Sequence, residues 1–369
     1  MSLKSGVIFH LLLGFAGWTG SSAAADIPAA LQKVLEDFHT ANPSAPGIVV
    51  HLESPRLGVF WTSAVGMADP LTGSTLTPAH TFRIASNTKT YVAAAVLRLA
   101  ERGELSLDDS LDRHLPVALV DLLTDDGYDL SAMTIDQVLA HTSGLFEHPA
   151  DPRYEESILA DPQYNWTRLE QITRCVEWGD PVGGPGEKFS YSDTGYIILG
   201  GIIATLTGQN LGVAVRELLE FEKLGLTSTW WEVLEEKPPA VGPRAHQFYG
   251  NLDTFDWNPS LDLYGGGGLV CDVNDLARFT RLLMKGKVLH RESSLAAMTG
   301  DGTADFRLGL VCDDFGDGLA WGHTGFWNTF VFHLPEHDLT VSGCILDHFA
   351  ERGRELARQL VSAALAPTP

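Results

Sequence analysis

The chain has 369 residues, of which 44% are hydrophobic and 20% charged, a composition typical of a globular protein with a substantial core. Its 47 acidic and 25 basic residues give a net charge of −22, which repels phosphate backbones and anionic lipid headgroups. Nucleic acid is therefore not expected as a partner. The length alone favours roughly two structural units.

The first residues have the pattern of an export signal. Lys4 precedes a short apolar run, Gly6–Trp18, and the alanines at 23–25 fit a small-residue cleavage site. We therefore predict a signal peptide over residues 1–25, cut before Asp26, and a periplasmic or secreted protein. The apolar run is shorter than the roughly 20 residues of a membrane-spanning helix, so no stable membrane span is expected.

Strand patterns occur at both ends of the remaining chain. Pro46–Gly66 contains two β-rich runs about a Ser54-Pro55-Arg56 turn, which predicts a hairpin. Three more strand patterns lie near the C-terminus, in the stretches FRLGLVCD, HTGFWNTFVFHLPE and LTVSGCIL. A helix over Phe349–Leu365 is predicted to close the chain.

Helical periodicity dominates the middle of the chain, with apolar residues at three- and four-residue spacing. It predicts helices over Asn87–Arg102, Ile135–His141, Leu169–Glu177, Thr194–Thr207, Leu211–Glu220 and Asp272–Met284. The simplest arrangement is an α+β fold, in which one antiparallel sheet built from both termini is flanked by helices and carries a mostly helical insertion. We predict one domain over residues 26–369, with a sheet part (26–82 plus 265–369) and a helical part (83–264).

The cysteines and one histidine motif do not indicate a metal site. The widely spaced Cys175, Cys271, Cys312 and Cys344 could form disulfides after export, but buried free thiols are at least as expected in a chain of this length. The stretch His333–His337 matches the H-x-x-E-H zinc pattern, which requires a helix. Pro335 would break that helix, so a strand end and a turn are predicted there. No metal or organic cofactor is expected.

Ser86 and Lys89 stand three residues apart where a helix is predicted to begin. Residues at this spacing are neighbours on a helix, and a serine hydroxyl needs an adjacent base to act as a nucleophile. The free N–H groups of a first helical turn could also stabilise an oxyanion. The alternative is that Ser86 caps the helix and Lys89 is solvated.

Two further motifs strengthen the catalytic interpretation. Tyr191 and Asp193 precede an apolar helix in FSYSDTGYIILG, and HTG (323–325) lies on a strand in GHTGFWNTF. In order and separation, these motifs resemble the S-x-x-K, Y-x-N and K-T-G or H-T-G motifs of the serine β-lactamase and penicillin-binding protein superfamily. The resemblance covers nearly the whole chain after the signal. It is closest to the class C β-lactamase-like branch, which includes D-alanyl-D-alanine carboxypeptidases and esterases, and it implies the same fold.

The resemblance also implies roles for the motif residues. Ser86 would be the nucleophile of an acyl-enzyme, Lys89 would hold or accept its proton, and Tyr191 would be the second proton-transfer group. The backbone N–H groups of Ser86 and Phe326 would form the oxyanion hole. The substrate would be bound by Asp193, His323, Thr324 and Gly325.

Two residues depart from the family pattern. Asp193 replaces an asparagine, and either keeps Lys89 charged, leaving Tyr191 as the base, or caps the following helix. His323 replaces the lysine of most β-lactamases, offers no fixed positive charge, and is more typical of the carboxypeptidases. Nearby, His141 is interpreted as a structural loop residue, and Ser143 is a minor rival nucleophile.

We therefore expect a serine hydrolase that acts on a D-Ala-D-Ala peptide, a β-lactam or a carboxylic ester. A non-catalytic penicillin-sensing relative, in which Asp193 prevents turnover, and a structural envelope protein are the alternatives. The walls of the substrate pocket are expected from the loops 151–166 and 230–257. Their aromatic residues are Tyr154, Tyr164, Trp230, Trp231, Phe248 and Tyr249.

Overall fold

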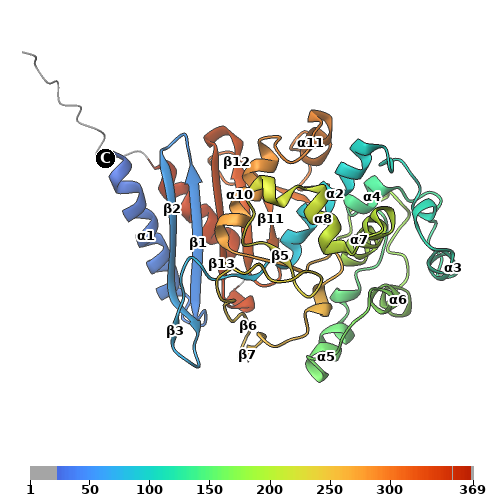
Figure 1. The fold of residues 1–369 in the computed structure, drawn as a ribbon, viewed down its shortest axis with the longest axis horizontal. Helices are drawn as coiled ribbons and strands as arrows, with labels where there is room; N and C mark the ends of the chain where they lie inside the picture. Colours follow the sequence, from blue (N-terminus) through green and yellow to red (C-terminus); the bar gives the residue numbers. More distant parts are fainter. Residues whose placement is uncertain (1–22, 351, 367–369) are drawn as a thin grey trace, which may run out of the picture.

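The computed structural model describes residues 23–350 and 352–366 (Figure 1). An eight-stranded sheet has the strand order β3-β2-β1-β13-β12-β11-β10-β9, and every neighbouring pair is antiparallel. The strands are β1 (Gly47–Ser54), β2 (Val59–Asp69), β3 (Ser74–Thr75), β9 (Phe306–Arg307), β10 (Leu310–Asp314), β11 (Leu319–Gly325), β12 (Thr329–Leu334) and β13 (Leu339–Ile345).

The first and last parts of the chain meet in the middle of this sheet. Strand β1 pairs with β13, with Ile48 opposite Ile345 and Glu53 opposite Thr340. The α+β fold predicted from the sequence, with one antiparallel sheet from both termini, is thereby confirmed. The predicted hairpin forms β1 and β2. Most of the predicted signal peptide lies outside the described residues, and residues 23–25 begin helix α1 (Ala23–Ala41).

Helices cover both faces of the sheet. On β1, Ile48, Val50 and Leu52 share a buried cluster with α1 and α12 (Gly353–Leu365), whereas Val49 belongs to the cluster on the opposite face. This alternation follows from the two-residue period of a strand. Helix α10 (Val273–Met284) packs on the opposite face, against β12 and β13. Because both faces are covered, all of β1 is buried.

The helical part is inserted between β3 and β9, and its helices α3 to α7 lie on the right side of Figure 1. It contains two small sheets, β4 (Phe82–Arg83), β8 (Leu269–Cys271) and β5 (Trp230–Trp231), and β6 (Phe248–Tyr249) with β7 (Leu252–Asp253). Its helices are α2 (Thr88–Arg102), α3 (Val117–Asp125), α4 (Ile135–Leu139), α5 (Pro152–Ala160), α6 (Arg168–Trp178), α7 (Asp193–Thr207), α8 (Leu211–Leu218), α9 (Phe221–Leu224) and α11 (Glu292–Thr299).

The six predicted internal helices are present with ends shifted by a few residues. Helices α3, α5, α9 and α11 lie outside the predicted segments, and short helices of this kind depend on tertiary packing more than on local sequence. The last helix begins at Gly353, because the predicted start at Phe349 falls in a 3₁₀ turn, His348–Ala350. Among the described residues, no single helix is long and apolar enough to cross a membrane. The pair α7 and α8 meets those criteria only jointly, and is bent by 76°.

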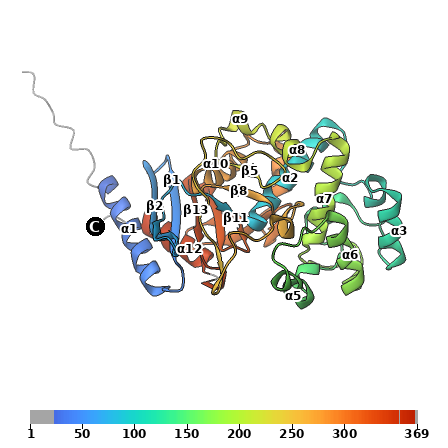
Figure 2. The same ribbon diagram turned by 60° about the horizontal axis from the view of Figure 1, so that its bottom comes forward.

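Helix α2 is the central element between the sheet and the helical part. It contacts α7 and α8, and the turn before it contacts β11 and β12 (Figure 2). Residues 88–99 are all buried, which a helix surrounded by protein requires. The helix ends at Gly103, whose φ of 74° lets the chain turn back and satisfy the last carbonyls.

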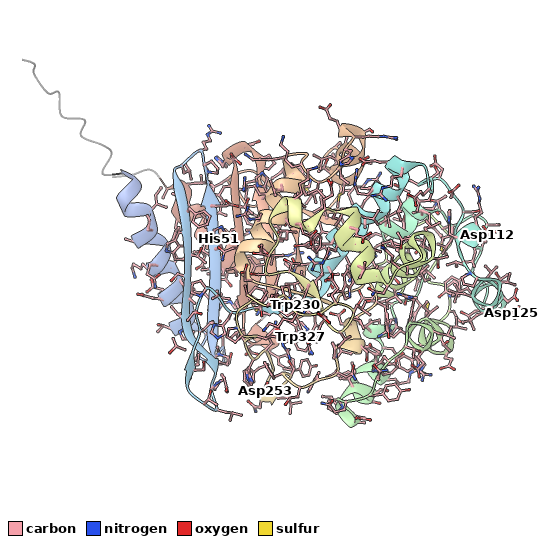
Figure 3. The ribbon with its side chains drawn as sticks, in the orientation of Figure 1. His51, Asp112, Asp125, Trp230, Asp253 and Trp327 are labelled. Atoms are coloured by element: carbon pink, nitrogen blue, oxygen red, sulfur yellow. The ribbon has the colours of Figure 1, made fainter. Side chains whose placement is uncertain are left out.

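The cysteines and the H-x-x-E-H stretch have structural roles. All four cysteines are free and buried, so the predicted alternative of buried free thiols, and not that of disulfides, is found. His333 lies near the end of β12, and Pro335 begins a 3₁₀ turn, as predicted. The side chain of His333 is 2% exposed and pairs with Thr340 through Nδ1 at 2.9 Å. His51 on β1 pairs with Thr62 in the same way at 2.7 Å (Figure 3).

From these two buried histidines we predict that the folded protein loses stability in acid. Burial lowers the pKa of His51 and of His333 to about 4. Because the unfolded chain then binds more protons than the folded chain between pH 4 and 6.5, stability is complete above pH 6.5 and falls as the pH drops toward 4. Each histidine accounts for at most about 3 kcal/mol of this loss.

Urea unfolding at pH 4, 5, 6 and 7 measures the effect. The variant His333→Asn keeps a hydrogen-bonding side chain but cannot titrate, and its stability should depend less steeply on pH than that of the wild type. An equal slope in both proteins would contradict the assignment.

Candidate active site

The sequence around Ser86 forms a tight turn rather than the first turn of an α-helix. Residues 85–87 are a 3₁₀ turn, and α2 begins at Thr88. Ala85 has a φ of 46°, a strained conformation for a residue with a side chain and one that is frequent at functional sites. The turn places Ser86, which is partly exposed, at the N-terminal end of α2 and in the wall of a cavity.

Two polar side chains bind this turn to the sheet. Asn87 donates from Nδ2 to the carbonyl of Ile84 at 2.9 Å and to Thr329 Oγ1 at 2.8 Å. The Thr329 hydroxyl donates to the same carbonyl at 2.9 Å. These bonds fix the nucleophile turn against the start of β12. Nothing in the local sequence pattern indicated either residue.

Lys89 is completely buried beneath Ser86. Its Nζ donates to Ser86 Oγ at 2.9 Å and to the Gly266 carbonyl at 2.8 Å, and forms an ion pair with Asp193. The alternative of a solvated lysine is therefore wrong. Burial alone would lower the pKa of Lys89, but Asp193, followed by Tyr191 and Asp262, raises it above its ordinary value. In the unliganded site Lys89 is an ammonium that donates to Ser86.

Asp193 is the first residue of α7 but does not cap it. The cap is Ser192, whose Oγ accepts from the Gly195 N–H at 3.3 Å. The Asp193 carboxylate contacts Lys89 instead, which agrees with the expectation that it keeps the lysine charged. The sequence left open whether Asp193 caps the helix or holds Lys89 charged, and the structure gives the cap to Ser192 and the lysine contact to Asp193.

Tyr191 completes the group around Ser86. Its ring centre lies 5.0 Å from Lys89 Nζ, and His141 packs against it with ring centres 4.2 Å apart. Burial raises the pKa of Tyr191, and the charge of Lys89 opposes that rise. Tyr191 is therefore a neutral phenol in the unliganded site. It can become a base only when the charge around it changes.

His141 and Ser143 are structural. His141 Nδ1 accepts the Ser192 N–H at 3.0 Å, so this histidine supports the loop that carries Tyr191. Ser143 is 2% exposed, and its Oγ faces the backbone N–H of Leu145 at 3.4 Å. It does not line the cavity, which excludes it as a rival nucleophile there.

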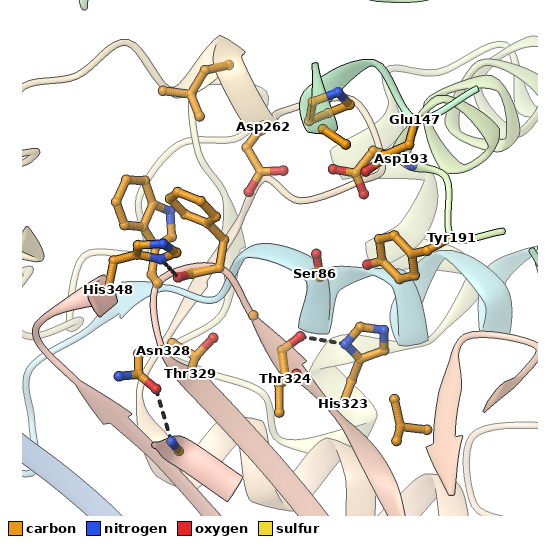
Figure 4. A pocket seen from close by; sticks show the side chains of 18 of the residues that line it. Ser86, Glu147, Tyr191, Asp193, Asp262, His323, Thr324, Asn328, Thr329 and His348 are labelled. Atoms are coloured by element: carbon orange, nitrogen blue, oxygen red, sulfur yellow. Dashed lines mark hydrogen bonds between the residues drawn. The ribbon is translucent and has the colours of Figure 1, made fainter. Parts of the chain in front are cut away.

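The HTG motif forms the end of β11 beside the nucleophile turn. A Cβ on Gly325 would lie 2.3 Å from the Ile84 carbonyl and 2.4 Å from Thr329 Oγ1, so only glycine fits this close approach. The approach brings the backbone of Phe326 next to the turn of Ser86. Thr324 also lines the cavity (Figure 4). The two oxyanion donors predicted from the sequence thus belong to adjoining segments.

His323 is buried and neutral. Its side chain is 3% exposed, and Nδ1 donates to the Thr324 carbonyl at 2.5 Å. Burial, with a smaller effect of Lys89, lowers the pKa of His323 to about 3. It therefore offers no positive charge to a substrate carboxylate near neutral pH.

Glu147 and Asp262 are two carboxyl groups that the sequence analysis missed. Both line the cavity, on the same side of Ser86 as Asp193 (Figure 4). The Glu147 carboxylate accepts the Asp193 N–H. Burial and the charge of Asp193 raise the pKa of both groups, that of Asp262 to about 7. Both lie in loops without a recognisable motif, so only the fold shows that they face Ser86.

The cavity has a volume of about 1020 Å³. Both predicted wall segments contribute to it, but of the six aromatic residues named above only Tyr154 and Tyr249 line it. Trp257, Phe326 and Trp327 add to the aromatic wall. The charged residues of the lining are Glu147, Glu155, Asp193, Asp262, Asp305, Asp313 and Arg354.

Comparison with known proteins assigns the family. The family model described as Beta-lactamase matches residues 40–363. The chain belongs to the β-lactamase family. Its fold is the β-lactamase fold, with Ser86 and Tyr191 in the wall of one cavity and Lys89 buried beneath Ser86.

Three individual similarities are more limited. Protein flp of Staphylococcus aureus (strain COL) is 34% identical over 152 residues, which are 41% of this chain but only 28% of that relative's length. A Salmonella paratyphi A protein, named as a proposed D-alanyl-D-alanine carboxypeptidase, is 24% identical over 88% of this chain and 80% of its own. The D-amino acid amidase from Ochrobactrum anthropi SV3, complexed with L-phenylalanine amide, has a TM-score of 0.78 at 23% identity. That match covers 92% of this chain and 98% of the amidase, and shows a shared fold.

The Lys89–Asp193 pair predicts the result of Asp193→Asn. Loss of the carboxylate removes the main influence that raises the pKa of Lys89, so the acidic limb of kcat/KM should move to lower pH by about one unit or more. Hydrolysis of p-nitrophenyl acetate between pH 5 and 10 measures it. Ser192→Ala is the matched control, because loss of the cap should cost about 1 kcal/mol of stability without moving the pH profile. An unchanged profile in Asp193→Asn would refute the role of the carboxylate.

Proposed function

We propose that this protein hydrolyses small amides or esters that carry an ammonium group near the scissile carbonyl, such as amino acid amides and esters, through an acyl-enzyme on Ser86. The observation that carries the proposal is the group of carboxylates beside Ser86, formed by Glu147, Asp193 and Asp262. The carboxylate of Asp262 lines the cavity, and burial and neighbouring charges, without a hydrogen bond from the described residues, set its pKa.

The charge of the cavity favours an amine over a carboxylate. Among the described residues, six acidic side chains line it, and Arg354 is the single arginine or lysine in the lining. Arg354 itself lies 3.7 Å from Asp313. D-Ala-D-Ala peptides and penicillins carry a carboxylate, and neither neutral His323 nor the paired Lys89 offers a free charge for it. A substrate ammonium, in contrast, would compensate carboxylates that are costly to ionise in a buried site.

A bound ammonium also suits the proton transfers of the reaction. Positive charge beside Asp193 and Asp262 weakens their hold on the Lys89 proton, so the pKa of Lys89 falls and its amine becomes available as a base. The oxygen of Ser86 then bonds to the carbonyl carbon while its proton passes to Lys89. The backbone N–H groups of Ser86 and Phe326 stabilise the negative oxygen.

The second half of the reaction reverses the roles. The proton reaches the leaving amine or alcohol through Tyr191 as the bond to the carbonyl carbon breaks. Water then attacks the acyl-enzyme, gives its proton to the same groups, and releases the acid with Ser86 restored. The fold shared with an amidase in complex with an amino acid amide supports this substrate class.

The alternatives give different results in one experiment. The protein is incubated with phenylalanine amide of each hand, p-nitrophenyl acetate, a chromogenic cephalosporin and a D-Ala-D-Ala peptide, and the mass of the Ser86 peptide is followed. We expect fastest turnover of an amine-bearing substrate. Preference for the cephalosporin or the D-Ala-D-Ala peptide would refute the proposal, and an adduct that persists would indicate a sensing protein. Export is also part of the proposal, and N-terminal sequencing of the secreted protein should begin at Asp26.

Asp262→Asn tests the carboxylate directly. Since charge-assisted hydrogen bonds contribute about 1.5–3 kcal/mol, KM for an amine-bearing substrate should rise about tenfold or more at pH 8, with KM for p-nitrophenyl acetate unchanged. In the wild type, KM for the amine-bearing substrate should fall as the pH rises through 7, where Asp262 ionises. Asp317→Asn, a change at an exposed position outside the cavity, is the control for net charge.

Stability provides a readout that is independent of substrate. A carboxyl group whose pKa is raised on folding makes the protein less stable as the pH increases from about 4 to 7. Asp262→Asn should remove this part of the decline and melt no lower than the wild type at pH 8. A lower melting temperature would show that the carboxylate stabilises the fold rather than serving the site.

A further inference from the structure

The turn that carries the Phe326 N–H is held by the segment that follows the last strand. His348 Nδ1 donates to the Phe326 carbonyl at 2.5 Å (Figure 4). Asn328 donates from Nδ2 to the Asp347 carbonyl at 2.9 Å and accepts the Gly353 N–H at 3.1 Å through Oδ1. Three hydrogen bonds therefore connect Asp347, His348 and Gly353 to the turn between β11 and β12.

The ring of His348 also stacks on Phe326. Their ring centres are 4.0 Å apart at 24°, and Tyr249 stacks on the other two rings, with centres 5.1 Å from His348 and 6.0 Å from Phe326. The Phe326 side chain is 48% exposed, so the core does not fix it. His348 holds this residue at two points, its carbonyl and its ring.

The turn needs such support because it is not a relaxed one. Asn328 has a φ of 56°, a conformation that costs energy for a residue with a side chain. Among the described residues, the Phe326 N–H has no acceptor within the protein, so its direction is not set by a hydrogen bond of its own. An oxyanion donor is effective only when it points at the developing charge from about 2.7–3.1 Å.

We propose that His348 is a positioning residue, which orients the oxyanion-binding N–H of Phe326 by holding the carbonyl of the same residue. This inference rests on the acyl transfer of the proposed function, and not on its preference for amines. The hydrogen bond selects the tautomer with a proton on Nδ1, and protonated histidine retains the same donor. The group acts through the backbone and needs no contact with the substrate.

Two variants separate the hydrogen bond from the ring. His348→Phe keeps an aromatic ring for stacking and removes the donor. His348→Asn removes the ring, but its Nδ2 can donate from near the position of Nδ1. Phe349→Leu is the matched control, because the Phe349 ring packs against Tyr249 and edge-on against His348 but makes no hydrogen bond to the turn and does not line the cavity.

The experiment uses the full-length secreted protein with p-nitrophenyl acetate as substrate and a boronic acid as an analogue of the tetrahedral intermediate. In His348→Phe, kcat should fall 10- to 100-fold with KM within twofold, and the boronic acid should bind more weakly by a similar factor. His348→Asn should recover kcat to within about fivefold of the wild type. Melting temperatures show whether each variant is folded.

Each other outcome overturns the inference. Wild-type activity in His348→Phe would show that the carbonyl needs no support, and equal loss in both histidine variants would assign the effect to the ring. A change confined to KM would place His348 in contact with the substrate. Failure of the wild type itself to form an acyl-enzyme on Ser86 would refute the proposed function, and is recognised before any variant is compared.

Discussion

The site depends on one buried charge. The Nζ of Lys89 donates hydrogen bonds to Ser86 Oγ and to the Gly266 carbonyl, and forms an ion pair with the Asp193 carboxylate. A buried ammonium without partners would destabilise the folded protein by several kcal/mol. The lysine therefore requires Ser86, Gly266 and Asp193 in these positions. The lysine thereby fixes α2, α7 and the glycine-rich segment before β8 relative to one another. The nucleophile, its proton-transfer partner and one wall of the cavity follow from that arrangement.

Under the proposed function, the reaction and the choice of substrate depend on different residues around Lys89. In the proposed reaction, Ser86, Lys89 and Tyr191 carry out an acyl transfer that many substrates could undergo. What distinguishes this chain is the surplus of carboxylates around the pair, together with a histidine at position 323 that burial keeps neutral. Under the proposed function, this acidic surplus disfavours substrates with a carboxylate and favours those with an amine. The choice of substrate would then depend on the electrostatics of the cavity more than on the motifs.

The residues that sequence analysis could identify are those whose partners lie nearby in the chain. Ser86 and Lys89 share one turn, and the strands at both ends show their own alternation, so the motif and the sheet were predictable. Asp193 could be recognised as a motif residue, but its role could not be decided from the sequence. Ser192 beside it is an equally good helix cap, and only the structure shows which of the two caps the helix. Glu147, Asp262 and His348 were missed for a different reason. Each lies in irregular structure, and only long-range packing decides which way its side chain points.

The oxyanion turn shows how far this long-range dependence extends. Its donor belongs to the end of β11, which lies beside Ser86 because Gly325 has no side chain. Its carbonyl side is held by residues that follow β13, and β13 pairs with β1 from the opposite end of the chain. The segment after β13 lies beside the turn because β12 and β13 form a hairpin, in which Thr329 stands opposite Cys344. The proposed oxyanion geometry therefore depends on that hairpin for the support of the Phe326 carbonyl, and on Gly325 for the close approach to Ser86.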